Sequence, residues 1–290
     1  MRVDGEGPIT CLMVTDRALK CQEPSFSHKL QDRANRMCSW LCIGLDPDPD
    51  RLPGHLPRTT AGIVHFCRKI VEATGEYALG YKPNVAFFEA LGPEGWTALH
   101  EIRACVPPGV PVIADAKRGD IGHTARAYGK AFFDVLGCDA LTVNPYLGPD
   151  SLEPYMGHPG RCILVLTRTS NEGASVVQDR DIRGVPMYLA IARWAMDLDG
   201  PTEVGFVVGA TQLSAIQNIR SDFPNALLLL PGVGVQGAGA HASAVAAAGD
   251  DGQQALISVS RQILYASSGR DFAEAAAREA RALAAETWLG

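Results

Sequence analysis

"VPVIADAK", residues 110–117, is an apolar run that ends in an acid and a base, Asp115 and Lys117. A run that is apolar almost throughout is typical of a strand in a parallel sheet, because helices or neighbouring strands cover both of its faces. The stretch therefore predicts a buried parallel strand that carries two charged side chains at its carboxyl end.

Seven further runs of the same kind extend the pattern in both directions. They cover residues 38–46, 77–84, 139–145, 161–169, 203–211, 226–234 and 255–261. Segments in which apolar residues recur every three or four positions separate them, for example Ile121, Ala125, Tyr128, Phe132 and Leu136. Eight strand and helix repeats, with no GxGxxG motif after the first strand, favour a closed (β/α)8 TIM barrel over an open doubly wound sheet.

The domain organisation follows from the same pattern. Residues 1–24 fit none of the strand and helix units and are expected to form an N-terminal leader, atypical or disordered. Residues 25–290 are expected to form a single barrel domain, in which residues 25–36 make a short helix before the first strand. The polar segment 171–183 is long enough to form a mobile loop over a site.

Composition excludes several classes of protein. No apolar run reaches the roughly 18 residues that a spanning helix needs, so we expect no membrane segment. The net charge of -6 argues against nonspecific nucleic-acid binding, while a local basic pocket for one phosphate remains open. The 8 cysteines form no CxxC pair and favour a reduced, cytoplasmic protein. The 7 histidines show no HxH or HxxxH spacing, so no metal site is expected.

Polar residues terminate most of the apolar runs, where a barrel of this type carries its chemistry. They are Asp46, Lys82, Asp115, Lys117, Asn144, Thr169, Ser170 and Arg261. Asp115 and Lys117 are two apart on an extended strand and share a face, and Lys82 ends the adjacent strand, which predicts an array of alternating charges. Asp120 lies within about 10 Å of Lys117 along the chain and could fold back or project into a partner subunit.

Several of these residues also have a structural alternative. An isolated Asp-x-Lys is usually a surface ion pair, although the full D-x-K-x-x-D set with Lys82 favours a catalytic site. Asp46 could instead cap a helix, and Ser170 could cap a turn.

A phosphate site is predicted at the ends of the last two strands. "PGVGVQGAG", residues 231–239, is rich in glycines that let backbone N–H groups approach an anion, and "SVSR" ends in Arg261. Gln236 could donate from its side chain. Ordinary turn chemistry is the alternative explanation for the glycines.

Eight segments in order resemble the family of orotidine 5'-phosphate decarboxylases, in its longer bacterial (type 2) branch. They are "LCIGLDPDP", "YKPNVAFFEALG", "IADAKRGDIGHTA", "TVNPYLG", "TSNEGA", "FVVGAT", "PGVGVQG" and "VSRQILYA". The similarity runs from about residue 26 to the C-terminal helix, while the leader departs from the family pattern.

The resemblance implies a decarboxylation of orotidine 5'-monophosphate (OMP) to UMP without cofactor or metal, in a homodimer with shared sites. It implies that Lys117 protonates C6, that Asp115 lies near the substrate carboxylate, and that Lys82 and the partner subunit's Asp120 complete the charged network. The remaining substrate contacts that it implies are Asp46 and Lys82 to the ribose, Ser170 to the pyrimidine, Gln236 and Arg261 to the phosphate, and Ile121 and Thr124 across the dimer.

Three other functions remain open from the sequence. A Mg2+-dependent phosphosugar decarboxylase or aldolase of the same superfamily would share D-x-K-x-x-D. A silent nucleotide-binding barrel would bind UMP without turnover. A Schiff-base aldolase would use Lys117 or Lys82 as nucleophile, but flanking carboxylates raise the pKa of a lysine, which is the wrong direction.

Overall fold

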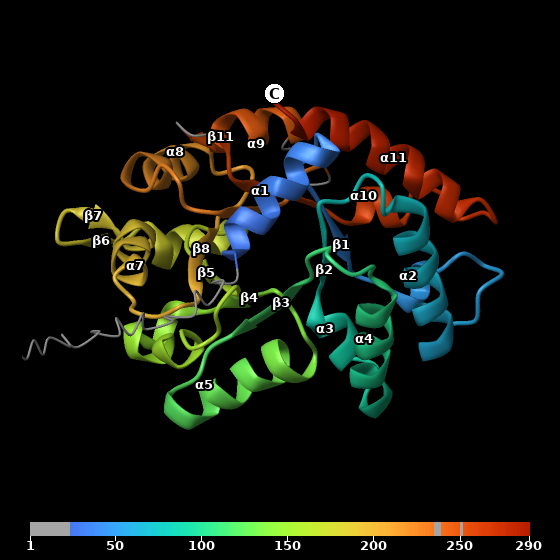
Figure 1. The fold of residues 1–290 in the computed structure, drawn as a ribbon, viewed down its shortest axis with the longest axis horizontal. Helices are drawn as coiled ribbons and strands as arrows, with labels where there is room; N and C mark the ends of the chain where they lie inside the picture. Colours follow the sequence, from blue (N-terminus) through green and yellow to red (C-terminus); the bar gives the residue numbers. More distant parts are fainter. Residues whose placement is uncertain (1–23, 235–238, 250–251) are drawn as a thin grey trace, which may run out of the picture.

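The structure, a computed structural model, describes residues 24–234, 239–249 and 252–290. Its main sheet has eight parallel strands in the order β2-β1-β12-β9-β8-β5-β4-β3 (Figure 1). The strands are β1 (Leu41–Leu45), β2 (Gly80–Pro83), β3 (Ile113–Arg118), β4 (Ala140–Val143), β5 (Cys162–Leu166), β8 (Glu203–Val207), β9 (Leu228–Pro231) and β12 (Ala255–Val259). Seven of them lie within the predicted runs, and β3 extends one residue beyond its run of residues 110–117, to Arg118.

The two end strands of this sheet, β2 and β3, are joined by two isolated parallel bridges. One pairs Tyr81 with Val112, and the other pairs Asn84 with Asp115. These bridges close the sheet into a ring, which confirms the predicted (β/α)8 barrel. We call this sparsely bridged joint between β2 and β3 the seam.

Helices surround the strands, as the 3.6-residue patterns predict (Figure 1). The longer ones are α2 (Thr60–Thr74), α4 (Pro93–Cys105), α5 (Gly122–Gly129), α7 (Met187–Met196), α8 (Leu213–Asp222), α9 (Ala240–Ala247) and α11 (Phe272–Thr287). Short helical pieces are η1 (Pro49–Arg51), α3 (Val85–Glu89), η3 (Pro145–Leu147), η4 (Pro149–Ser151), η5 (Glu153–Tyr155) and α10 (Arg261–Leu264). A π-helical turn, η2 (Lys130–Val135), extends α5 and completes the helical segment predicted around residues 121–136.

Helix α1 (Phe26–Met37) confirms the helix predicted before the first strand. The Ser25 hydroxyl caps it by accepting from the His28 N–H, and Phe26, Leu30 and Ala34 form its buried face. The backbone N–H and hydroxyl of Ser27 donate to the Glu203 carboxylate at the start of β8. Helix α1 therefore closes the amino-terminal end of the barrel, opposite the charged strand ends.

The polar segment after β5 contains more regular structure than a plain loop. It forms η6 (Glu172–Ala174), α6 (Ser175–Gln178) and a two-stranded hairpin of β6 (Asp181–Ile182) and β7 (Val185–Pro186). Arg168 holds it through an ion pair with Asp179 of 2.7 Å. A second small hairpin, β10 (Ala248–Gly249) with β11 (Gly252–Gln253), follows α9.

In the residues that the structure describes, no helix is both long enough and apolar enough to span a membrane. The predicted leader, residues 1–24, lies outside the described residues except for Pro24.

Candidate active site

Two lysines share one carboxylate at the seam of the barrel. Lys82 Nζ lies 2.7 Å from Asp115 Oδ2, and Lys117 Nζ lies 2.5 Å from Asp115 Oδ1. The Thr142 hydroxyl, from β4, donates to Asp115 Oδ1 at 3.1 Å. The structure thus brings together the alternating array that the sequence predicts from Lys82, Asp115 and Lys117.

Burial and mutual attraction fix the charge states of the inner pair. Burial alone would lower the pKa of Lys82, but attraction to Asp115 and Asp46 outweighs it and the pKa is raised. Burial alone would raise the pKa of Asp115, but Lys82 and Lys117 hold it well below its usual range. An ammonium and a carboxylate therefore persist inside the protein, where either ion alone would be costly. The side chain of Lys117 is 48% exposed and stands at the open side of the pair.

The backbone at Lys117 differs from the extended strand that the sequence argument assumed. Its φ is 49°, in the left-handed region, and the ladder between β3 and β4 shifts register between Ala114 and Arg118. The Lys117 N–H donates to the Thr142 hydroxyl at 2.9 Å, which anchors this irregular turn. The two side chains contact each other as the prediction of a shared face requires, although the backbone at Lys117 is irregular and not regularly extended.

A cavity of about 190 Å³ opens beside the inner pair. Its lining residues are Asp46, Lys82, Asn84, Asp115, Pro231, Gly232, Val233, Ser258, Ser260 and Arg261. Among the described residues, Asp46 Oδ1 and the Ser260 hydroxyl are buried without a hydrogen-bond partner. Buried polar atoms normally find partners, so these two are suited to a hydroxyl-bearing ligand.

Asp46 follows β1 and lines this cavity, while Asp48 caps the short helix η1 by accepting from the Asp50 N–H. The alternative in which Asp46 is a helix cap was therefore wrong.

The predicted phosphate end is partly within the described residues. Arg261 begins α10 and also lines a second hollow of about 360 Å³ next to the first, together with Asp48, Arg51, Phe87 and Tyr265. Gly232 and Gly234 have φ values of 100° and 85°, which favour glycine in this turn. Gln236 lies outside the described residues.

The remaining predicted residues lie away from this cavity. Ser170 follows β5 and packs against Gly209, where an added Cβ would come within 2.8 Å of the Ser170 Cβ. Asp120 Oδ1 accepts from the Ile121 N–H at 2.8 Å at the start of α5. Ile121 is 57% exposed and Thr124 is half-buried. None of these last three residues lines the cavity.

Sequence reasoning missed four residues of the site. Asn84, Ser258 and Ser260 line the cavity, and Thr142 binds both Asp115 and the Lys117 backbone. The available signal was a polar residue inside or just after an apolar run, as in "YKPN", "ALTV" and "SVSR".

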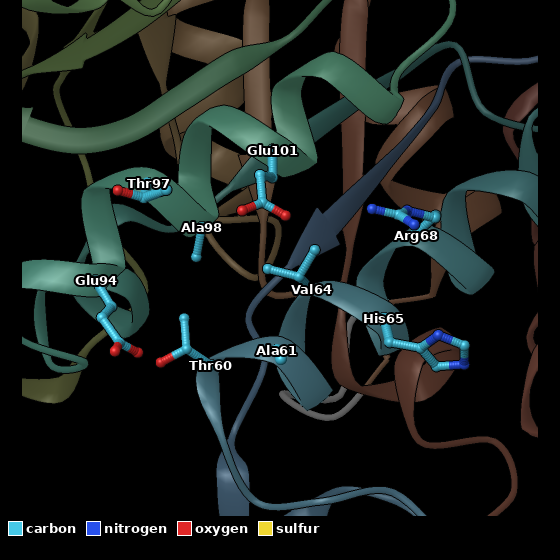
Figure 2. Close-up of a pocket in the computed structure, with 9 residues that line it drawn as sticks. All are labelled: Thr60, Ala61, Val64, His65, Arg68, Glu94, Thr97, Ala98 and Glu101. Carbon is cyan, nitrogen blue, oxygen red and sulfur yellow. The ribbon is translucent and has the colours of Figure 1, made fainter.

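Size alone does not identify the site. A hollow of about 490 Å³ lies between the outer helices α2 and α4 (Figure 2), where α2 contributes His65 and Arg68 and α4 contributes Glu94 and Glu101. It contains no residue of the array. Across the described ranges, no cluster of three or more His, Cys, Asp and Glu side chains is arranged to hold a metal ion.

Comparison with known proteins identifies the family of the chain. A family model described as "Orotidine 5'-phosphate decarboxylase / HUMPS family" matches residues 39–277. A protein of Roseiflexus sp. (strain RS-1) named orotidine 5'-phosphate decarboxylase is 49% identical over 256 residues, which are 87% of this chain and 93% of that protein. A protein of the same name from Herpetosiphon aurantiacus is 49% identical over 89% of this chain and 96% of that protein.

A solved structure of Leishmania donovani OMP decarboxylase has a TM-score of 0.76 and 41% identity, over 90% of this chain and 99% of that chain. The match therefore extends over the whole barrel, including every strand that carries a charged residue of the site. On the fold, the charged array and these similarities, the chain belongs to the orotidine 5'-phosphate decarboxylase / HUMPS family.

Proposed function

We propose that this chain converts OMP into UMP and CO2, with Lys117 as the group that stabilises and protonates C6. The observation that carries the proposal is the Asp115 carboxylate held between Lys82 and Lys117 beside a cavity. Relatives that are 43–49% identical bear the name of this decarboxylase, which favours it over a phosphosugar enzyme of the same family.

The chemistry needs a fixed positive charge at one atom. Loss of CO2 from C6 leaves an electron pair in the plane of the ring, where no adjacent carbonyl delocalises it. An ammonium held at that carbon stabilises the developing charge and then transfers its proton. Lys117 suits this role because its Nζ reaches the open side of the array while Asp115 holds it in place.

Asp115 contributes by repelling the substrate carboxylate, but repulsion is only a part of the barrier reduction. Two like charges about 4 Å apart repel by roughly 4 kcal/mol at an effective dielectric near 20. A very proficient enzyme lowers its barrier by up to about 23 kcal/mol. Transition-state stabilisation by Lys117 and binding energy from the rest of the nucleotide must therefore supply most of the effect.

That binding energy comes from the two ends of the cavity. Asp46 and Lys82 bind the ribose hydroxyls, and the unpartnered Asp46 oxygen supports this assignment. Arg261 and Gln236 bind the phosphate, and Ser170 contacts the pyrimidine edge. The exposed position of Arg261 beside a glycine turn supports the phosphate assignment.

The active unit is a homodimer that shares its sites. Asp120, Ile121 and Thr124 reach the partner's cavity from the start of α5. The absence of these residues from the lining of their own cavity and the 57% exposure of Ile121 support this assignment, since an apolar side chain at that exposure suits an interface. We assign the protein to the cytoplasm, because the six cysteines in the described residues are free thiols.

The test is turnover of OMP by purified protein in EDTA, followed by the absorbance change of the pyrimidine. The unsubstituted protein is expected to be fully active, and Lys117→Ala is expected to lose at least about a thousandfold in kcat, because electrostatic stabilisation and protonation are removed together. Lys69→Ala is the matched control, since Lys69 pairs with Glu72 on the surface of α2. Activity that EDTA abolishes and Mg2+ restores would favour the phosphosugar enzyme instead, and an active Lys117→Ala variant would refute the assigned role.

A further inference from the structure

Arg118, the residue after Lys117, has contacts that the proposed chemistry does not explain. Its guanidinium pairs through Nη2 with the Glu89 carboxylate at the end of α3. The same guanidinium lies over the Tyr128 ring, 5.2 Å from its centroid, and 5.6 Å from the centroid of the Phe132 ring. Arg118 thus joins the end of β3 to α3, α5 and the π-helical turn η2.

The backbone of Arg118 is anchored as firmly as its side chain. The Asn144 N–H donates to the Arg118 carbonyl at 2.7 Å, and the preceding Lys117 N–H is bound to Thr142. The left-handed turn at Lys117 therefore lies immediately before a residue that is fixed at both its carbonyl and its guanidinium. A residue held in this way sets the direction in which the Lys117 side chain leaves the strand.

The ion pair of Arg118 crosses the same seam as the catalytic array. Lys82 belongs to β2, and α3, which carries Glu89, begins at Val85. Asp115, Lys117 and Arg118 all belong to β3. The Arg118 and Glu89 pair therefore ties α3, the helix that follows β2, to the end of β3, while the Lys82 and Asp115 pair joins the two strands themselves.

The site of Arg118 is imperfect for local stability. Its Nε is buried and has no hydrogen-bond partner among the described residues. An unsatisfied buried donor disfavours the folded state, so a residue chosen only for packing would avoid it. The planar guanidinium, however, stacks on aromatic rings while it pairs with a carboxylate, which a lysine does less well.

We propose that Arg118 is a positioning residue that fixes the distance between Lys117 and the reacting carbon through Glu89, Tyr128 and Phe132. This inference rests on the proposed function. It assigns to Arg118 no contact with substrate.

The test compares Arg118→Met, Arg118→Lys and Glu89→Gln in OMP turnover. Methionine keeps the apolar length over the rings and removes the charge. We expect kcat to fall between about tenfold and about a hundredfold, because a small misplacement of a reacting group has effects of this size. The KM for OMP and the affinity for UMP, measured by titration calorimetry, are expected to stay within about threefold, since ribose and phosphate contacts are unchanged.

Lysine at 118 is expected to restore part of kcat, and Glu89→Gln to lower kcat without weakening UMP binding. The double variant Arg118→Met with Glu89→Gln should be no slower than Arg118→Met alone, because both changes remove one interaction. The matched control is Arg193→Met, which breaks a surface pair with Asp222 of 2.8 Å between α7 and α8 and should leave kcat unchanged.

The outcomes separate the two proposals. If the unsubstituted protein does not turn over OMP, the proposed function fails and this inference fails with it. If the protein is active and Arg118→Met keeps the full kcat, positioning is refuted. A loss of kcat and of UMP affinity together with a lowered Tm, repeated in Glu89→Gln, would show that the pair acts only on stability and would also overturn the inference.

Discussion

Tyr81 is a buried residue whose hydroxyl is hydrogen-bonded, and it shows how burial affects the pH dependence of stability. Its ring is fully buried in β2, and its hydroxyl donates to the Val71 carbonyl at 3.1 Å and lies 2.9 Å from the Thr74 hydroxyl. Burial raises the pKa of Tyr81 to about 12, against smaller opposing effects of Thr74 and Arg33. The protonated form is thus strongly preferred in the folded state.

The sign of the pH effect follows from this raised pKa. An unfolded tyrosine loses its proton near pH 10, while Tyr81 in the folded protein keeps its proton up to about pH 12. The stability is therefore complete below pH 10 and falls as the pH rises between these values. In Tyr81→Phe, the slope of unfolding free energy against pH in this window is expected to become shallower by about 1.4 kcal/mol per pH unit.

Urea unfolding at a series of pH values measures this slope. At neutral pH the variant should lose about 1 kcal/mol, the net value of one hydrogen bond. Tyr146→Phe is the control, because Tyr146 is 74% exposed and its change should leave both quantities as they are. An unchanged alkaline slope in Tyr81→Phe would contradict the assignment.

The identities of the charged residues could be predicted from the sequence, but their geometry could not. Lys82, Asp115 and Lys117 each end an apolar run, and runs that end at one rim bring such residues together. The left-handed φ of Lys117 has no sequence signal, because lysine rarely adopts it and only the anchors from β4 explain it. Thr142 and Ser258 were missed because a single hydroxyl within an apolar strand is more often a core residue.

At the scale of elements, strands and helices were predictable where their periods are regular. The eight strands and α1 lie within one residue of the predicted ranges. The segment 171–183 was expected to be a loop because it is polar, yet pairing between Arg168 and Asp179 and between Thr169 and Gln178 organises it. Such contacts depend on residues outside the segment's own pattern, so its local sequence does not reveal them.

The close approach of two strand ends gives a prediction at this scale. Gly209 follows β8 and leaves no room for a side chain, since an added Cβ would lie 2.8 Å from both the Cβ and the backbone nitrogen of Ser170. Gly209→Ala is therefore expected to displace the segment after β5, to cost about 1–3 kcal/mol of stability and to raise the KM for OMP.

Gly157→Ala provides the control, because nothing lies within 4 Å of its added Cβ. Thermal unfolding and steady-state kinetics measure the two effects. An unchanged KM in a folded Gly209→Ala variant would argue against a substrate contact by Ser170.

At the scale of the whole molecule, the count of strands decided the fold. Eight buried runs separated by helical segments allow a closed ring, and the bridges between β2 and β3 confirm it. The number of strands does not indicate to which protomer's active site each charged residue contributes. Asp120, Ile121 and Thr124 do not line the cavity of their own protomer, and sequence spacing allowed Asp120 either to fold back or to reach a partner.

Mixing two inactive variants tests the shared site. In a dimer of Lys82→Ala with Asp120→Ala, one site combines both changes and the other combines an intact Lys82 with the intact Asp120 of the other protomer. Random exchange between the two dimers is expected to restore about a quarter of the activity, because half of the dimers are mixed and each holds one intact site. Mixing Lys82→Ala with Asp115→Ala is the control and should restore nothing, because both residues come from the same protomer. Failure to recover activity in the first mixture after proven exchange would show that each protomer works alone.

The seam both closes the barrel and carries its charged site. Strands β2 and β3 share two isolated bridges, and the bond between Lys82 and Asp115 spans the same gap. The barrel is thus closed at the position of the proposed reaction. A nucleotide bound there would also stabilise this closure and slow amide exchange in both strands. Loss of these charges would weaken the closure of the barrel itself. Evolution toward a new reaction at this rim would therefore first need another interaction between β2 and β3.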